Sequence, residues 1–186
     1  MDKTKKDIKT SLVKKRANLP VAPLQAQMKN GRHVVNTKNL NGKKSAGFTY
    51  WLGMPLATAK TMLSDFDIVK LSSAGITKSA IHTLAAYIGI SRKNMAEDIF
   101  DVSVKTLERK DGKARLDKKT SSHALEIAKV VQHAYEVFRD EEKVKVWINR
   151  ENKALNNMKP IQIFDTLSGL NKVNDILGRI EEGVYS

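Results

Sequence analysis

The sequence predicts an all-α protein in which a helix-turn-helix domain is followed by a small helical C-terminal domain and preceded by a basic N-terminal arm. From residue 77 onward, apolar residues recur at spacings of three and four, as on one face of an amphipathic helix. Ser and Thr stand before several of these segments, where helix N-caps are common. A content of 41% hydrophobic and 28% charged residues is typical of a globular protein. At 186 residues, we expect two small domains.

Residues 1–47 are predicted to be a basic arm that is largely disordered on its own. The first 50 residues hold 12 of the 33 Lys and Arg against two Asp, so they carry +10 of the net charge of +13. Pro20, Pro23 and two Asn-Gly pairs interrupt any regular pattern. We expect such an arm to bind a polyanion, and nucleic acid ranks first. A membrane surface ranks lower, because the arm lacks the aromatic and leucine face of an interfacial helix.

Composition excludes several classes of protein. The chain has no cysteine, which excludes disulfides, thiol nucleophiles and thiolate metal sites. No apolar run approaches the roughly 20 residues that span a bilayer, and the first residues contain no apolar stretch of the kind found in a signal peptide. We therefore expect a protein of the reducing cytoplasm.

The segment from Phe48 to Leu71 introduces the folded part. Aromatic and apolar residues gather between Phe48 and Met54, and Pro55 is placed to open a helix whose apolar side includes Met62 and Leu63. Residues 66–71 alternate apolar with polar types, which predicts a short strand or an extended linker. Thr77 is then expected to cap a helix that ends at Ile88. Its predicted core residues are Ile81, Leu84, Ala85 and Ile88.

Residues 89–115 are predicted to form the helix-turn-helix. Ser91 can cap a short helix with Met95, Ala96 and Ile99 inward, and residues 100–102 then turn the chain into a second helix opened by Ser103. In that second helix, Val104 and Leu107 can face the core. The turn is one residue longer than the common short form and has Phe100 and Asp101 where a glycine is frequent.

The second helix has a polar and basic face suited to the major groove of DNA. The alternative is an ordinary solvated amphipathic helix, because Lys-rich faces often serve solubility alone. The candidate DNA-binding residues are Ser103, Lys105, Thr106, Arg109, Lys110, Lys113 and Arg115.

The longest helix is expected over residues 121–138. Its apolar stripe consists of Ala124, Ala128, Val131, Tyr135 and Phe138. The stripe could pack against the body of the chain or pair two chains, and the pattern alone does not separate the two. A homodimer is favoured because helix-turn-helix proteins read paired half-sites through two-fold symmetry.

Three further segments complete the C-terminal domain. Residues 140–149 are expected to form a short helix with Val144, Trp147 and Ile148 inward, and a loop runs from 150 to 159. Pro160 is expected to open a helix that Ser168 and Gly169 stop, before a last helix over residues 171–182. The apolar stripe of the last helix is Val173, Ile176, Leu177 and Ile180. Gly183 breaks it, and the terminal residues 184–186 are either tucked onto the body or presented to a partner.

The sequence offers no catalytic constellation. The four histidines are not grouped at metal-ligand spacing, and neither a phosphate-binding glycine loop nor a nucleophile motif is present. Glu181 and Glu182 are adjacent on a helix and point in different directions. We therefore predict a binding protein without cofactor or metal, and not an enzyme.

The order of these parts resembles the Xre/MbcA/ParS family of type II antitoxins over residues 66–186. The resemblance rests on the following residues: Gly75-Ile76, Gly89-Ile90-Ser91, Phe100-x-Val102-Ser103-x-Lys105-Thr106-Leu107, Arg115-Leu116, Phe138, Trp147, Pro160, Gly169 and the run from Gly178 to Tyr185. The run Gly178-Arg179-Ile180-Glu181-Glu182-Gly183-Val184-Tyr185 is its most specific part. Two features depart from the family: residues 156–158 lack the paired glycines usual there, and the basic arm is not shared.

The resemblance implies two binding activities. The helix-turn-helix half would dimerise and repress its own operon, and the C-terminal half would bind a RES-domain toxin, an enzyme acting on NAD, with the tail closing the active-site entrance. The residues implied at the toxin surface are Arg179, Glu181, Gly183, Val184, Tyr185 and Ser186. The expected domains are the arm at 1–47, the helix-turn-helix domain at 48–119, and a dimerisation helix with the toxin-binding domain at 120–186.

Two other functions compete with this interpretation. One is a dimeric helix-turn-helix transcription regulator without a toxin partner. The other is a nucleic-acid-binding scaffold driven mainly by the arm, which would keep binding without Lys105 and Arg109 but not without residues 1–47.

Overall fold

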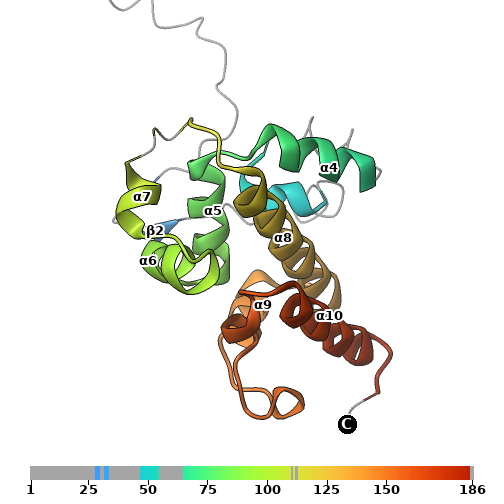
Figure 1. Ribbon diagram of the computed structural model, residues 1–186. Helices are drawn as coiled ribbons and strands as arrows, with labels where there is room; N and C mark the ends of the chain where they lie inside the picture. The colour runs from blue at the N-terminus through green and yellow to red at the C-terminus, as the bar shows by residue number, and fades with distance from the viewer. Residues whose placement is uncertain are drawn as a thin grey trace, which may run out of the picture. The chain divides into compact units, whose positions relative to one another are not determined.

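The computed structural model describes residues 28–29, 32–33, 47–54, 65–109, 111 and 113–184 of the chain. It divides into two units, Met1–Val35 and Asn36–Ser186. In the first unit, β1 (Met28–Lys29) pairs antiparallel with β2 (Arg32–His33). Most of the predicted arm and the helix predicted from Pro55 lie outside the described residues. The described part of the second unit is helical, as the sequence predicts (Figure 1).

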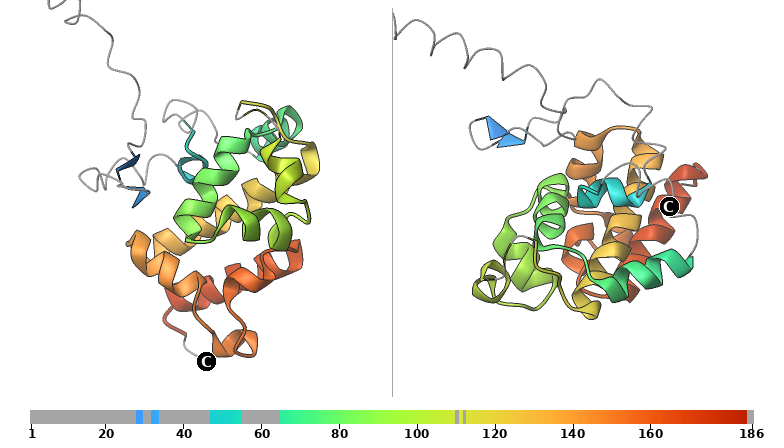
Figure 2. Two further views of the ribbon diagram at one scale, coloured as in Figure 1. Left: turned by 90° about the vertical axis from the view of Figure 1, so that its left-hand side faces the viewer. Right: turned by 90° about the horizontal axis from the view of Figure 1, so that it is seen from above.

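Helix α8 (Lys118–Phe138) lies at the centre of the second unit, and helices that precede and follow it in the chain pack against it (Figures 1 and 2). It begins three residues before the predicted start because the carboxylate of Asp117 accepts a hydrogen bond from Thr120 N at 2.9 Å. Four residues of the predicted stripe, Ala124, Ala128, Val131 and Tyr135, are buried within one chain, and the fifth, Phe138, is partly buried. Tyr135 packs against Trp51 with ring centroids 5.4 Å apart. The stripe therefore packs the body.

The short helix η1 (Phe48–Leu52) covers one side of α8. Trp51 and Leu52 are buried, as expected from the cluster of aromatic residues there. The indole Nε1 of Trp51 donates a hydrogen bond to Gln132 Oε1 at 2.7 Å, which satisfies both buried polar groups.

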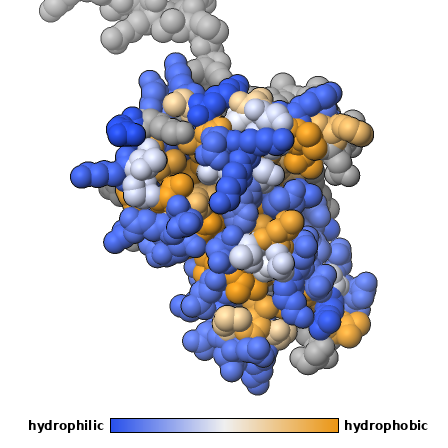
Figure 3. All heavy atoms as spheres, viewed as in Figure 1, coloured by the Kyte–Doolittle hydropathy of each residue, from blue (hydrophilic) through white to orange (hydrophobic). Residues whose placement is uncertain are grey.

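Helix α4 (Asp65–Ala74) occupies the segment for which the sequence predicted a strand or linker, so that prediction is wrong. Ile68, Leu71 and Ser72 lie at helical spacing and face inward, and α4 packs on α8. Phe66 and Val69 point outward, with 76% and 55% of their surface exposed, and hydrophobic side chains are visible at the α4 end in Figure 3. A segment of six residues is too short to distinguish the two-residue period of a strand from the 3.6-residue period of a helix.

Helix α5 (Lys78–Ile88) confirms its prediction. Thr77 Oγ1 accepts a hydrogen bond from Ala80 N at 3.3 Å, and the helix ends at Gly89. Its predicted core residues Ile81, Leu84, Ala85 and Ile88 are all buried.

The C-terminal part contains α9 (Glu141–Ile148), η3 (Lys153–Leu155), η4 (Pro160–Ile163) and α10 (Leu167–Glu181). Val144 and Ile148 of α9 are buried as predicted, and Trp147 packs against Phe138 at 5.5 Å. The prediction that Ser168 and Gly169 stop a helix is wrong, because both lie in the first turn of α10.

Gly169 has a different role from the predicted one. A Cβ added at this position would lie 1.8 Å from the carbonyl oxygen of Ile163, so only glycine lets α10 approach η4 this closely. Thr166 caps the helix by accepting a hydrogen bond from Gly169 N at 3.1 Å. The predicted inward stripe of α10 is confirmed, with Val173, Ile176 and Leu177 buried.

The loop over residues 156–158, where the sequence lacks the glycines that the resemblance leads one to expect, adopts a left-handed backbone. Asn156 and Asn157 have φ values of 54° and 63°, in the left-handed region. Asparagine is one of the few residues that tolerate this region, so the two asparagines form this turn without glycine. Asn157 N and Asn152 N close the loop through hydrogen bonds to Asn152 O and Met158 O, each at 3.0 Å.

Candidate functional site

The helix-turn-helix turn is built without glycine. Helix α6 (Arg92–Asn94) continues into a π-helical turn, η2 (Met95–Ile99), and Phe100 N donates to Met95 O at 3.3 Å. Asp101 then adopts φ 52° and Val102 N returns to Ala96 O at 2.9 Å. The wide turn and the left-handed aspartate together accommodate the extra residue noted in the sequence. The Ser91 cap and the buried Met95, Ala96 and Ile99 are confirmed.

Helix α7 (Val104–Glu108) presents the predicted polar face. Ser103 Oγ accepts a hydrogen bond from Thr106 N at 3.1 Å, and Leu107 is buried. Lys105, Thr106 and Arg109 are exposed. These three line one shallow depression with Ser103 and Glu108. Lys110 lies outside the described residues.

The two basic residues of the following loop are not equivalent. Both residues are exposed, but the guanidinium of Arg115 also donates a hydrogen bond to the carbonyl of Gly75. Leu116 N also donates to Ile76 O at 2.9 Å, and Arg115 pairs with Thr77 in an isolated bridge. Arg115 therefore helps to tie the end of the helix-turn-helix to the start of α5, in addition to its predicted contact with DNA.

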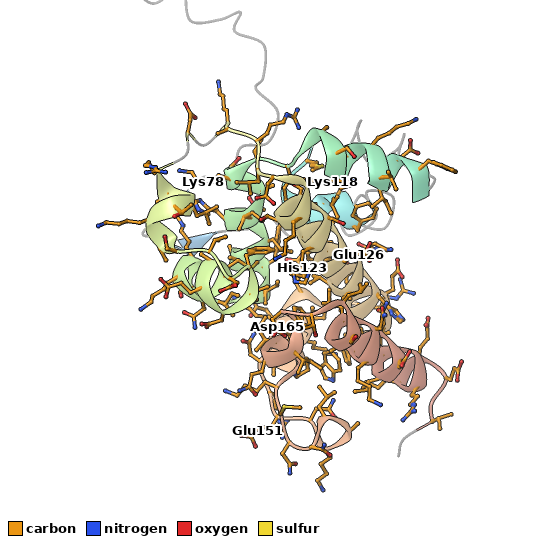
Figure 4. All side chains as sticks on the ribbon, in the orientation of Figure 1. Lys78, Lys118, His123, Glu126, Glu151 and Asp165 are labelled. Atoms are coloured by element: carbon orange, nitrogen blue, oxygen red, sulfur yellow. The ribbon has the colours of Figure 1, made fainter. Side chains whose placement is uncertain are left out.

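An ion cluster between α5 and α7 was missed by the sequence analysis. Lys78 Nζ donates to the Glu108 carbonyl at 3.0 Å and lies 3.5 Å from Glu108 Oε2; Figure 4 labels Lys78 beside α7. His82 Nε2 lies 3.0 Å from Glu108 Oε1, without the geometry of a hydrogen bond. Lys78 and Glu108 are 30 residues apart, so no local pattern signals this contact.

The pKa of His82 is lowered from its usual value of 6.5. Burial is the main cause, followed by the positive charge of Arg92, and the nearby Glu108 carboxylate opposes both. The cluster therefore combines a lysine and a glutamate with an imidazole that resists protonation.

His123 joins three parts of the protein. Its Nε2 is hydrogen-bonded to the Phe164 carbonyl at 2.7 Å, and its ring meets Phe100 edge-on at 5.7 Å. In Figure 4, His123 lies on α8 above the segment that carries Asp165. This histidine therefore has a packing role. Within the described residues, no group of three His, Asp or Glu side chains could hold a metal ion.

The end of α10 is closed by a backbone motif. Gly183 has φ 73°, Gly183 N donates to Ile180 O at 3.1 Å, and Val184 N donates to Arg179 O at 2.9 Å. This is the Schellman pattern, in which a left-handed residue caps the last turn. It confirms that Gly183 ends the helix.

The predicted partner-binding residues gather at this end. Val184 is 54% exposed and is therefore not tucked onto the body. Arg179 and Glu181 are also exposed, and Glu181 Oε2 lies 3.6 Å from His133 Nε2. Tyr185 and Ser186 lie outside the described residues.

Across the described helices, none is both long enough and apolar enough to span a bilayer.

Comparisons with known proteins agree with this geometry. Residues 67–129 match the model of the antitoxin Xre-like helix-turn-helix domain, and residues 133–183 match that of the antitoxin Xre/MbcA/ParS C-terminal toxin-binding domain. A curated relative named Antitoxin Xre, from Photorhabdus laumondii subsp. laumondii, is 29% identical over 90 residues. The match covers 47% of this chain and 61% of that relative.

The two matched segments include more than half of the chain and meet within α8. Both models describe binding domains, and neither describes an enzyme. The chain therefore belongs to the Xre/MbcA/ParS family of antitoxins.

Proposed function

We propose that this chain is the antitoxin of a type II toxin–antitoxin system. Its C-terminal domain binds a RES-domain, NAD-consuming toxin, and its tail occludes the toxin's active site. The observation that carries this proposal is the capped end of α10, from which an exposed Val184 leads away. The match of residues 133–183 to a toxin-binding domain supports it.

The geometry at this end suits occlusion. The buried stripe of α10 fixes the helix to α8, so the position from which the tail starts is set by the core. The left-handed Gly183 then redirects the backbone, and no atom lies within 4 Å of the place where its Cβ would be. The following Tyr185 offers an aromatic stacking face and a hydroxyl group to the toxin.

The second proposed activity is repression of its own operon by a homodimer. The capped N-terminus of α7 and its exposed Lys105, Thr106 and Arg109 suit a major groove. We assign a phosphate contact to the exposed Lys113. We propose that the chain binds its operator DNA in the cytoplasm. The domain boundaries at 47/48 and 119/120 are part of this proposal.

Co-purification with the product of the adjacent gene tests the proposal. We expect the full chain to form a complex, and a chain that ends at Gly183 to lose most of the affinity while its thermal midpoint changes little, because the truncation removes only one hydrogen bond of the α10 cap, from Val184 N to Arg179 O. A truncated chain that still inhibits the toxin's NAD consumption would contradict occlusion by the tail.

The alternative is a dimeric transcription regulator without a toxin partner. Exposed Phe66 and Val69 on α4 would serve as its dimer surface, because adjacent apolar side chains are common at protein interfaces. Specific binding to DNA upstream of the gene, without a complex with any neighbouring gene product, would support this alternative.

A further inference from the structure

A pocket of about 530 Å³ lies where the end of α8, the start of α9 and the end of α10 meet. Its lining residues are Glu136, Val137, Phe138, Arg139, Lys143, Ile180 and Glu181. It thus combines apolar side chains, which are partly buried against the core, with four charged ones. A pocket of this kind can hold one or two side chains of another protein.

The four charged side chains of the pocket differ in the contacts that they make within this chain. Glu136 Oε1 accepts a hydrogen bond from Gln132 Nε2 at 2.8 Å, and Glu181 Oε2 lies 3.6 Å from His133 Nε2. Arg139 and Lys143, in contrast, form no ion pair with any residue in the described part of the chain. The pocket therefore has two engaged carboxylates and two cations that are open to an external acid.

Arg139 also has an unusual backbone. It ends α8 with φ 57°, in the left-handed region, whereas α5 and α10 end with glycine in that region. A side chain in this conformation is strained relative to glycine. A strained residue in a pocket is a reason to look for a function of its side chain.

We propose that Arg139 and Lys143 bind a carboxylate side chain of the toxin, while a neighbouring apolar residue of the toxin packs on Val137, Phe138 and Ile180. This proposal rests on the proposed function and extends the toxin contact from the tail to the helices. Two observations indicate that the pocket binds an acidic side chain of the toxin. The open cations select an acidic group, and the pocket is continuous with the tail surface because Ile180 and Glu181 line it.

The decisive variant is Arg139→Gly. It removes the cation and relieves the left-handed strain, so the thermal midpoint should stay the same or rise. Affinity for the adjacent gene product, measured by calorimetry with the full chain, should fall about tenfold or more, and Lys143→Ala should act in the same direction. Lys172→Ala removes an exposed cation elsewhere on α10 and should leave affinity unchanged. Unchanged affinity in both Arg139→Gly and Lys143→Ala would overturn the proposal.

A second measurement separates this proposal from the proposed function. If the full chain forms no complex with the neighbour, the proposed function fails and the free chain is titrated with the dipeptide N-acetyl-Glu-Leu-amide. Amide NMR signals of residues 137–143 and 180–181 should then shift, and neither N-acetyl-Gln-Leu-amide nor the Arg139→Gly chain should show these shifts. Absence of the shifts in the unaltered chain would overturn the carboxylate site as well.

Discussion

Helices α7 and α10 carry the two candidate binding surfaces, and they are held in place in opposite ways. Helix α7 has five residues and one buried side chain, Leu107, so its position depends on Ser103 and on the Lys78–Glu108 contact. Helix α10 has 15 residues and a buried stripe that anchors it to α8. A short helix has little apolar area to bury and relies on polar contacts around it. The long helix supports itself and can present a free end.

The largest expected effect tests the anchoring of α10. Gly169→Ala should lower the free energy of unfolding by about 2 to 4 kcal/mol, because the added Cβ would clash with the Ile163 carbonyl. Gly178→Ala is the matched control, since the space around this helical glycine is open, and it should stabilise by up to about 1 kcal/mol. Urea denaturation measures both. Equal effects in the two variants would mean that α10 is not held by close packing at Gly169.

The next effect tests α7 as the DNA-reading helix. Arg109→Ala should weaken binding to DNA from upstream of the gene by about 1 to 3 kcal/mol if Arg109 contacts a base edge. Lys113→Ala should weaken specific and random DNA equally and reduce the salt dependence by about one unit of slope. Fluorescence anisotropy at several salt concentrations distinguishes them. Equal losses for Arg109→Ala on both DNAs would make Arg109 a phosphate contact.

A smaller effect tests the support of α7 by the ion cluster. Glu108→Gln and Lys78→Gln both weaken the contact but change the charge in opposite directions, and each should alter stability by less than about 1 kcal/mol. If the contact orients α7, both variants should lower the preference for specific over random DNA. If charge alone matters, one variant should strengthen DNA binding and the other weaken it.

The smallest effect concerns pH. Because the pKa of His82 is lowered in the folded state, the unfolded state binds a proton first as the pH falls below about 6.5. Stability from this residue is therefore complete above that pH and is lost as the pH falls toward the folded pKa. The unaltered chain should lose more stability than His82→Gln between pH 7 and pH 5, as measured by thermal unfolding. Parallel curves would assign the pH dependence to other groups.

Local patterns predicted much of the fold. The caps Thr77, Ser91 and Ser103 and the stripe of α10 follow from spacing within a single helix, and all are confirmed. The wrong predictions concern contacts between segments that are far apart in the sequence or in different elements, which the pattern of one segment does not reveal. Gly169 was interpreted as a helix stop because the approaching carbonyl of Ile163 is visible only in the fold.

The candidate sites follow the same division. The exposed face of α7 was predictable from its cap and its periodicity. The Glu108 cluster and the Arg139 pocket were not, because each joins residues from different helices. The left-handed conformations of Asp101, Arg139 and Asn156 likewise depend on the surrounding structure.

The course of α8 has a consequence for how this protein can be divided. Both matched domains contribute to this one helix, which is uninterrupted from Lys118 to Phe138 and has a length of about 30 Å. No linker separates the domains, and a cut between residues 129 and 133 would sever the helix and expose Leu125 and Val131 to water. A chimera that joins this helix-turn-helix domain to the C-terminal domain of a relative would therefore have to preserve the packing on both sides of α8.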